Sequence, residues 1–126
     1  MRKFVFLIIA LLVGALNAFG ASGYRNLMST EARKLVEQKK NLYLLDVRTQ
    51  DEFRQAHLKG SVLIPINEIE RRLGEVPRNR PILVLCAVGS RSNLVAGFLS
   101  SKGYGEVYNM QDGLMGWYRN GYPIER

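Results

Sequence analysis

Short, uniformly apolar runs recur along this chain of 126 residues and alternate with stretches in which apolar and polar residues mix. Residues 42–47 and 81–85 are the strongest runs, and both are rich in Leu, Ile or Val. Such runs are typical of strands that are buried on both faces of a sheet. Two shorter strands are predicted at 62–64, which is apolar, and at 106–108, where Val107 and Tyr108 follow Glu106, and a fifth strand fits near residues 24–26.

Helical periodicity fills the segments between these strands. Apolar residues at 94, 95, 98 and 99, for example, form one stripe of a helix that lies on a sheet. The expected helices cover about 29–40, 49–56, 67–74, 92–102 and 112–117. Strands that alternate with helices predict an α/β fold with three layers, in which a central parallel sheet of four to five strands has helices on both faces.

Residues with capping chemistry mark the ends of several expected helices. Ser29 and Asn67 are expected to cap the helices that they begin. Thr49 and Glu52 have the spacing of a capping box, in which each side chain accepts a hydrogen bond from the backbone N–H of the other residue. Gly74 and Gly103 are expected to end the helices that precede them, because glycine tolerates the left-handed backbone found there.

The start of the chain follows a different pattern. A basic segment (1–3) is followed by an apolar segment (4–16) and then by small, weakly polar residues (17–23). This order predicts that residues 1–20 are a secretory signal peptide, cleaved after Gly20. The apolar segment is shorter than the roughly 20 residues of a membrane-spanning helix, which favours cleavage over the alternative of a retained anchor. We therefore expect a periplasmic or secreted protein with no stable membrane association after cleavage.

The composition of the remaining domain, residues 24–126, narrows the classes of partner. The formal net charge of +7 falls to +5 without Arg2 and Lys3 (7 − 2), and the basic residues are scattered. The sequence has neither a long basic block nor the interleaved aromatic residues typical of nucleic-acid binding, so we expect no nucleic-acid partner. A mild positive field favours small anionic substrates. We expect the domain to act as a monomer.

Cys86 is the only cysteine, and it stands where a buried strand ends and a helix begins. Backbone N–H groups converge at such a junction and the helix dipole adds positive potential, so both stabilise a thiolate. Gly89 allows a tight turn, and Arg91 adds a cation. A lone cysteine is more often a small buried hydrophobe, but its position and a free thiol in an exported protein favour a reactive residue. The loop that follows consists of Ala87, Val88, Gly89, Ser90, Arg91 and Ser92.

Four other polar residues compete for a role in this site. Asp46 and Arg48 follow a buried strand, and we expect them to tie its end to neighbouring loops, with Asp46 beside the cysteine loop. His57 is the only histidine; a Cys–His pair is one interpretation, but a structural role is favoured. Ser92 is expected to cap the following helix, the alternative being a hydroxyl that donates to a bound anion. One cysteine and one histidine cannot fill a zinc site, so we expect no metal and no cofactor.

A set of short motifs, in this order and spacing, resembles the single-domain rhodaneses. The motifs are Asp46-Val47-Arg48, Glu52-Phe53, His57-Leu58-x-Gly60-Ser61-x-x-Ile64-Pro65, Cys86-x-x-Gly89-x-Arg91-Ser92, Gly103-Tyr104 and Gly113-x-x-x-Trp117. The resemblance runs from residue 29 to residue 124. Each motif alone is weak, whereas the ordered set is specific. Ala56 and Asp112 depart from the pattern, because glycines are usual at both positions, and these departures concern the geometry of local turns.

The resemblance implies five parallel strands and the transfer of a sulfane sulfur. In that chemistry the Cys86 thiolate takes the outer sulfur of thiosulfate or of a persulfide, holds it as a persulfide and passes it to cyanide or a thiol. The N–H groups from Ala87 to Ser92 are implied to bind the donor and stabilise the persulfide. The role of Arg91 is left open between binding the donor's sulfonate and bracing the loop.

Two other functions compete with catalytic sulfur transfer. Phosphatases and arsenate reductases of related fold have five residues between cysteine and arginine, whereas Cys86 and Arg91 are separated by four. We expect the shorter loop to fit a single sulfur atom but not a tetrahedral oxyanion. The other alternative is a persulfide carrier or binding module, which holds the sulfur for a partner without turnover.

Overall fold

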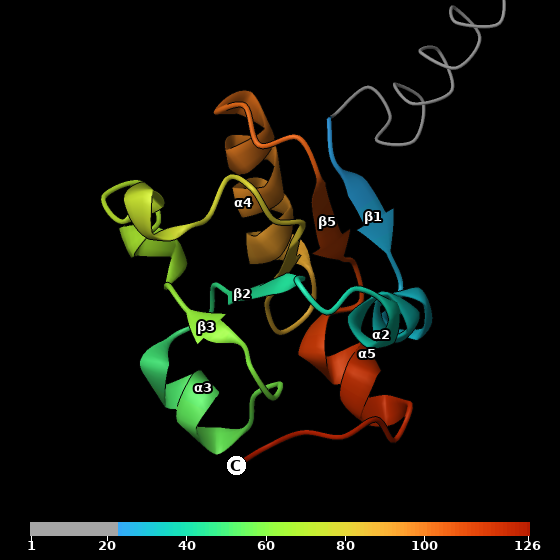
Figure 1. Cartoon of the computed structure of the whole chain (residues 1–126). Coiled ribbons are helices and arrows are strands. Elements are labelled where there is room, and N and C mark those ends of the chain that lie inside the picture. Colours follow the sequence, from blue (N-terminus) through green and yellow to red (C-terminus); the bar gives the residue numbers. More distant parts are fainter. Residues whose placement is uncertain (1–22) are drawn as a thin grey trace, which may run out of the picture.

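The computed structural model describes residues 23–126, which contain one sheet of five parallel strands (Figure 1). The strands lie in the order β1-β5-β4-β2-β3. Their bounds are β1 Arg25–Leu27, β2 Tyr43–Asp46, β3 Val62–Leu63, β4 Ile82–Leu85 and β5 Val107–Met110. The predicted α/β class is confirmed, and the fifth strand near residue 24 is present. The predicted signal peptide, residues 1–20, lies outside the described residues and stays a prediction.

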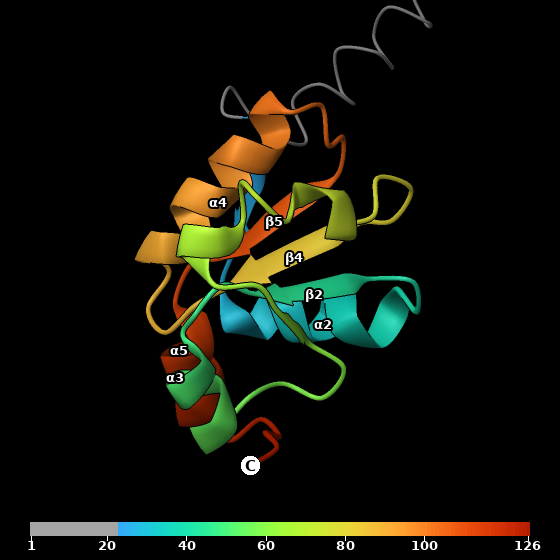
Figure 2. The same cartoon turned by 90° about the vertical axis from the view of Figure 1, so that its left-hand side faces the viewer.

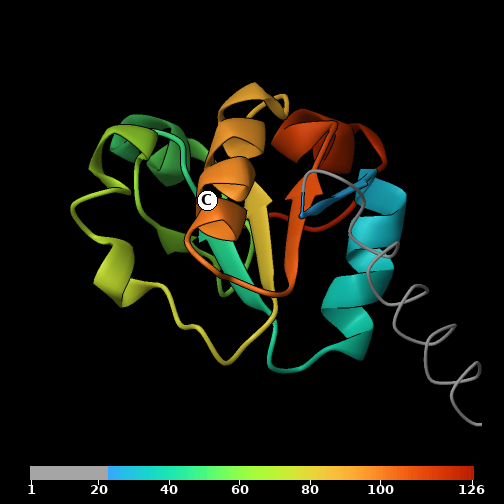
Figure 3. The same ribbon diagram turned by 90° about the horizontal axis from the view of Figure 1, so that it is seen from above.

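Helices cover both faces of the sheet, and Figure 2 shows the strands between α4 and α2. The helices α2 and α3 lie toward opposite edges of the sheet (Figure 3). The bounds are α2 Ser29–Gln38, α3 Gln50–Gln55, α4 Ser90–Ser101 and α5 Gly113–Arg119, with two 3₁₀ turns, η1 Ile66–Glu68 and η2 Leu73–Glu75. Among residues 23–126, none of the helices has the length and apolar character needed to cross a membrane.

Alternate residues of the strands enter two separate apolar layers. Tyr43, Leu45, Val84 and Val107 pack with residues of α4 and the 3₁₀ turns, while Leu44, Leu83, Leu85 and Tyr108 pack with residues of α2 and α5. Because helices cover both faces, the strands need apolar side chains at successive positions. This is why the strongest strands appear in the sequence as continuous apolar runs rather than as alternating ones.

The helix predicted at 67–74 is wrong, because this segment forms the turns η1 and η2 instead. Asn67 lies inside η1, makes no cap, and Gly74 lies inside η2. The apolar residues explain the difference. Ile66 and Ile69 are three residues apart, as are Leu73 and Val76, and all four pack against the α4 side of the sheet. A 3₁₀ turn has three residues per turn and places such pairs on one face.

The first turn of α2 is capped from elsewhere in the chain, not by the Ser29 hydroxyl that the sequence predicted. Ser29 is the first helical residue, after Met28, and its backbone N–H donates to Asp112 Oδ1 at 2.8 Å. Its hydroxyl donates to Asp112 Oδ2 at 2.6 Å. A carboxylate at a helix N-terminus accepts a hydrogen bond from a free N–H, and its negative charge interacts favourably with the helix dipole. Asp112, which departs from the rhodanese pattern, thus has a structural role here.

Helix α4 begins two residues earlier than predicted, at Ser90, and its apolar stripe is narrower. Val95 and Leu99 are buried against the sheet as expected, but Leu94 is 68% exposed. Ser92 is not the cap, because Gly89 occupies that position with φ +96° and Ser92 lies one turn inside the helix. At this position inside the helix, Ser92 is turned toward Cys86.

Two of the predicted helix ends are confirmed. The capping box of α3 is complete: Glu52 N–H donates to Thr49 Oγ1 at 3.2 Å, and Thr49 N–H donates to Glu52 Oε1 at 3.1 Å. Gly103 ends α4 with φ +90°. The N–H groups of Gly103 and Tyr104 donate to carbonyls in the last turn of α4. Ala56, the other departure from the rhodanese pattern, is extended (φ −166°), a backbone that any residue adopts.

Candidate active site

Cys86 lies directly after β4, at the carboxyl end of the sheet, and is completely buried. Its Sγ accepts hydrogen bonds from the backbone N–H of Gly89 at 3.1 Å and of Ser92 at 3.4 Å. The Ser92 hydroxyl lies 3.3 Å from the same Sγ. Three polar groups of one loop therefore converge on a single sulfur atom. The carboxyl edge of a parallel sheet is also where α/β proteins bind their ligands.

The loop is held in this shape from its outer side by the start of α5. The carbonyls of Cys86 and Ala87 accept hydrogen bonds from Leu114 N–H at 2.8 Å and Met115 N–H at 3.1 Å. These carbonyls are therefore directed outward. A peptide unit is planar and its N–H and C=O point in opposite directions, so the outward carbonyl of Ala87 orients the N–H of Val88 toward the thiol.

Two glycines allow the loop and the β5–α5 turn to approach so closely. A Cβ on Gly89 would lie 2.0 Å from the carbonyl oxygen of Gln111, and one on Gly113 would lie 2.3 Å from that of Ala87. Both glycines also have positive φ, +96° and +65°, where other residues are strained. The sequence predicted the turn at Gly89, but the contact that requires Gly113 depends on the tertiary structure.

Burial and hydrogen bonding act on the Cys86 thiol in opposite directions. Burial raises the pKa of the thiol, because a charged sulfur loses its solvation. The Ser92 hydroxyl and the N–H groups of Ser92, Val88 and Gly89 lower the pKa, because they favour the thiolate. The net effect is a pKa below that of an ordinary cysteine. Ser92 is thus one of the groups that stabilise the thiolate.

We expect alkylation of Cys86 to reveal this lowered pKa. Because the pKa is lowered, the thiolate persists as the pH falls below the value of about 8.5 at which an ordinary cysteine is half ionised. The iodoacetamide reaction rate, followed against pH, should therefore have its midpoint below that value, and Ser92→Ala should move the midpoint upward. A wild-type midpoint at or above about 8.5 would show that burial outweighs the hydrogen bonds.

Arg91 is directed away from the thiol and toward α3. Its Nη1 and Nη2 donate to the two carboxylate oxygens of Glu52 at 2.7 and 2.9 Å. This contact lowers the pKa of Glu52 to about 2, chiefly because Arg91 donates to it, and raises the pKa of Arg91. Between the two roles left open for Arg91, this geometry is that of a brace. Glu52 was expected only as part of a capping box, and no local signal linked it to a residue 39 positions away.

Asp46 and Arg48 form a buried ion pair at the end of β2, with 2.8 Å between Arg48 Nη2 and Asp46 Oδ2. The same Nη2 donates to the carbonyl of Ala56 at 2.6 Å, and Nη1 donates to the carbonyl of Glu52 at 3.4 Å. Within the described part of the chain, neither side chain forms a hydrogen bond to the loop 86–92. The pair fixes α3 to the sheet, and α3 carries the carboxylate that holds Arg91.

The side chains of the remaining predicted residues form no hydrogen bond to the thiol, and Val88 acts on it only through its backbone N–H. Ser90 and Val88 are exposed, and among residues 23–126 the Ser90 side chain forms no hydrogen bond to Cys86. His57 Nδ1 lies 2.8 Å from the carbonyl of Phe53, and the two rings stack with centroids 4.1 Å apart. Its backbone forms a bridge with Glu125. These contacts give His57 a structural position that anchors the C-terminal segment.

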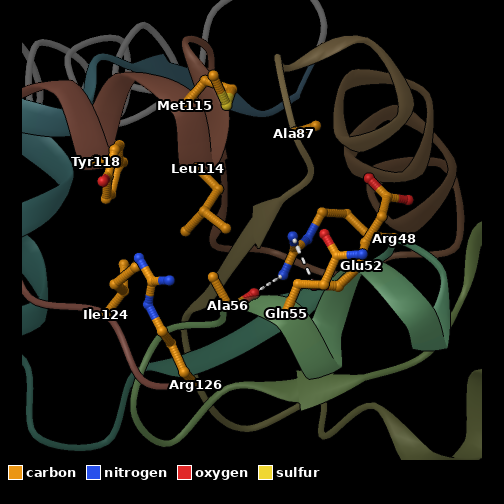
Figure 4. A pocket seen from close by; sticks show the side chains of 10 residues that line it. All are labelled: Arg48, Glu52, Gln55, Ala56, Ala87, Leu114, Met115, Tyr118, Ile124 and Arg126. Atoms are coloured by element: carbon orange, nitrogen blue, oxygen red, sulfur yellow. Dashed lines mark hydrogen bonds between the residues drawn. The ribbon is translucent and has the colours of Figure 1, made fainter.

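A pocket of about 380 Å³ borders the loop at Ala87, the residue after Cys86 (Figure 4). It lies between α3, which contributes Glu52 and Gln55, and α5, which contributes Leu114 and Tyr118. Arg48 forms part of its wall, and Figure 4 shows the hydrogen bond from this guanidinium to Ala56. The pocket provides space for a ligand next to the cysteine loop.

These features define a class of protein: a three-layer α/β domain with an anion-stabilising cysteine loop at the carboxyl end of its sheet. The rhodanese-like domain family model matches residues 28–120. The chain therefore belongs to the rhodanese-like family, as the order of its motifs predicted.

Known relatives agree with this assignment. A protein named sulfurtransferase from Allochromatium vinosum is 33% identical over 84 residues, which are 67% of this chain and 78% of that protein. The thiosulfate sulfurtransferase GlpE of Vibrio cholerae is 31% identical over 94 residues, or 75% of this chain and 88% of the relative. The crystal structure of a rhodanese-related protein from Thermoplasma volcanium is similar with a TM-score of 0.74 and 29% identity, and the match covers 81% of this chain and 98% of that one. At the level of the family, these names point to sulfur transfer.

Proposed function

We propose that this protein is a sulfurtransferase that moves a sulfane sulfur from thiosulfate or a persulfide to cyanide or a thiol through a persulfide on Cys86. The observation that carries the proposal is the convergence of Gly89 N–H, Ser92 N–H and the Ser92 hydroxyl on the only thiol of the chain. This arrangement favours the thiolate, and thiolates are the nucleophiles of such chemistry.

The reaction has two displacement steps. The Cys86 thiolate attacks the outer sulfur of thiosulfate, a new S–S bond forms, and sulfite leaves with the electron pair of the bond that breaks. Cyanide or a thiolate then attacks the outer sulfur of the Cys86 persulfide, and the Cys86 thiolate leaves with the electron pair of that bond. The N–H groups that contact Sγ stabilise negative charge on sulfur before the first step and after the second.

The size of the space enclosed by the cysteine loop, residues 86–92, supports a sulfur atom over a phosphate group as the bound species. The N–H groups of Gly89 and Ser92 approach one atom, the Cys86 Sγ, and the Ser92 hydroxyl approaches the same atom. A loop that binds a tetrahedral oxyanion needs its N–H groups to surround a larger centre. With four residues between Cys86 and Arg91, the loop is one residue shorter than in the phosphatases of related fold.

A paired assay tests the proposal and its alternatives. The protein should release thiocyanate from thiosulfate and cyanide over many turnovers, and its intact mass should increase by one sulfur atom after thiosulfate alone. Transfer of a single equivalent without turnover would indicate a persulfide carrier. Hydrolysis of an aryl phosphate without thiocyanate release would replace the proposal with a phosphatase.

Breaking the Arg91 brace is expected to slow transfer about 10-fold, since misplacing catalytic groups by about 1 Å costs up to about 100-fold. Glu52→Gln removes the charge that holds Arg91, and glutamine preserves the capping box of α3. Thiocyanate release under kcat/KM conditions measures the effect. Glu37→Gln is the matched control, because Glu37 pairs with Arg33 on the exposed face of α2. A faster reaction of Glu52→Gln with thiosulfate would contradict the brace and assign Arg91 to donor binding.

A further inference from the structure

We propose that the pocket beside the cysteine loop binds the organic part of the sulfur acceptor, which is a low-molecular-weight thiol with an apolar body and an anionic group. This inference rests on the proposed function, because it concerns the acceptor of the same reaction. The pocket residues that carry it are Ala56, Ala87, Leu114, Ile124, Gln55 and Arg126.

The size of the pocket exceeds what the smallest acceptor needs. Its volume of about 380 Å³ is in the range of sites that hold organic ligands. Cyanide has two heavy atoms and would occupy a small part of that space. The pocket begins at Ala87 and extends between α3 and α5 to the C-terminal segment, where it meets Ile124 and Arg126 (Figure 4). A molecule that fills it therefore has a sulfur end at the loop and a second end several bonds away.

The middle of the pocket is apolar. Ala56, Ala87, Leu114 and Ile124 contribute hydrocarbon surface to its walls, and Figure 4 shows Leu114, Ile124 and Ala56 grouped around the same space. Met115 at the rim is 46% exposed, although its side chain is apolar. Apolar surface that water touches in the free protein favours a ligand with a hydrocarbon body, because binding removes that surface from water.

Two of the charged residues in the wall are already occupied. Arg48 donates to Asp46 and to the carbonyls of Ala56 and Glu52. Glu52 accepts hydrogen bonds from Arg91 and from Thr49. These residues shape the pocket, but their main hydrogen-bonding capacity is used within the protein.

Arg126 is the available cation of the wall. Within residues 23–126 its guanidinium forms no ion pair or hydrogen bond, and neither does the side-chain amide of Gln55. Figure 4 shows the Arg126 side chain extending beside Ile124 at the border of the pocket. A guanidinium with free donors binds a carboxylate through two parallel hydrogen bonds. The end of the pocket opposite the loop thus favours an anionic group.

The sulfur step remains that of the proposed reaction. The thiolate of the bound acceptor attacks the outer sulfur of the Cys86 persulfide, the Sγ–S bond breaks, and the Cys86 thiolate leaves with the electron pair. The product is an organic persulfide, whose carboxylate stays at Arg126 until release. No oxidant or reductant is consumed in this exchange.

Three acceptors separate the contributions of body and charge: 2-mercaptoethanol, 6-mercaptohexanol and 6-mercaptohexanoate, each with thiosulfate as the donor. We expect kcat/KM to rise from the first to the second because of the longer hydrocarbon body. It should rise about 10-fold from the second to the third, the effect of one charge-assisted contact. The Arg126→Gln variant should reduce this preference for the acid over the alcohol to about one. The matched control is Arg119→Gln, because Arg119 is an exposed arginine at the end of α5 that is absent from the pocket wall; it should keep the preference.

A second variant tests the apolar part. Ala56→Leu should fill the pocket and lower kcat/KM for 6-mercaptohexanol more than for 2-mercaptoethanol, with thermal unfolding as the check on its fold. Equal kcat/KM for the three acceptors, or equal preferences in Arg126→Gln and Arg119→Gln, would overturn the acceptor pocket while thiosulfate-to-cyanide transfer remains. Failure of the wild-type protein to transfer sulfur even to cyanide would instead overturn the proposed function.

Discussion

Replacing Cys86 with serine is expected to abolish sulfur transfer and to leave the fold intact. Cys86 is the only cysteine, so no other thiol can hold the sulfane sulfur. A serine oxygen cannot form a persulfide, and loss of a nucleophile reduces turnover by at least about 1000-fold. Thiocyanate release from thiosulfate and cyanide measures the loss, and intact mass after thiosulfate should show no added sulfur.

The fold of this variant is expected to survive because serine retains the polar contacts of the loop. The N–H groups of Gly89 and Ser92, which donate to Cys86 Sγ, can donate to a hydroxyl in the same place. Thermal unfolding should therefore change little. A Cys86→Ser protein that is well folded and releases thiocyanate near the wild-type rate would eliminate the persulfide mechanism.

The parts of this fold that could be predicted from sequence are those set by local chemistry. The runs at 42–47 and 81–85 are apolar because both faces of their strands are buried, and that requirement is visible residue by residue. The capping box of Thr49 and Glu52 and the terminal glycine of α4 are also local, since their partners lie within a few residues.

Other features were missed because their partners are distant in the sequence. Asp112 caps α2 at Ser29, 83 positions away, and Glu52 holds Arg91 across 39 positions. The cysteine loop was predicted as an anion-stabilising turn, but its outer support by Leu114 and Met115 required knowledge of where α5 lies. The sequence therefore predicted a thiol followed by a tight loop, whereas the structure revealed which groups of the loop approach the thiol and what holds the loop in place.

Two errors came from periodicity. The segment 67–74 has apolar partners at a spacing of three, which fits 3₁₀ turns better than the single α-helix that was predicted. In α4, the adjacent pair Leu94 and Val95 gave no local sign of which residue faces the sheet, and Leu94 is the exposed one. Because the helix begins at Ser90, Ser92 is at the third helical position and faces the thiol instead of capping the end.

Gly113→Ala is expected to weaken both the fold and the activity, because the Cβ would lie 2.3 Å from the carbonyl oxygen of Ala87. That contact is too close for any relaxed structure, so the loop or the start of α5 has to move. We expect a destabilisation of about 2–4 kcal/mol. Displacing the loop's N–H groups by about 1 Å should slow the remaining folded protein about 100-fold. Thermal unfolding measures the loss of stability. Thiocyanate release, assayed below the unfolding temperature of the variant, measures the loss of activity separately.

Gly121→Ala is the matched control for this substitution. Gly121 has φ +74°, close to the +65° of Gly113, but a Cβ there meets no atom within 4 Å. The control therefore introduces similar backbone strain, of about 1–2 kcal/mol, without a collision against the cysteine loop. Its transfer rate should stay near that of the wild-type protein. If Gly113→Ala resembled Gly121→Ala in both stability and rate, the close packing of the β5–α5 turn against Ala87 would not be what holds the loop around Cys86.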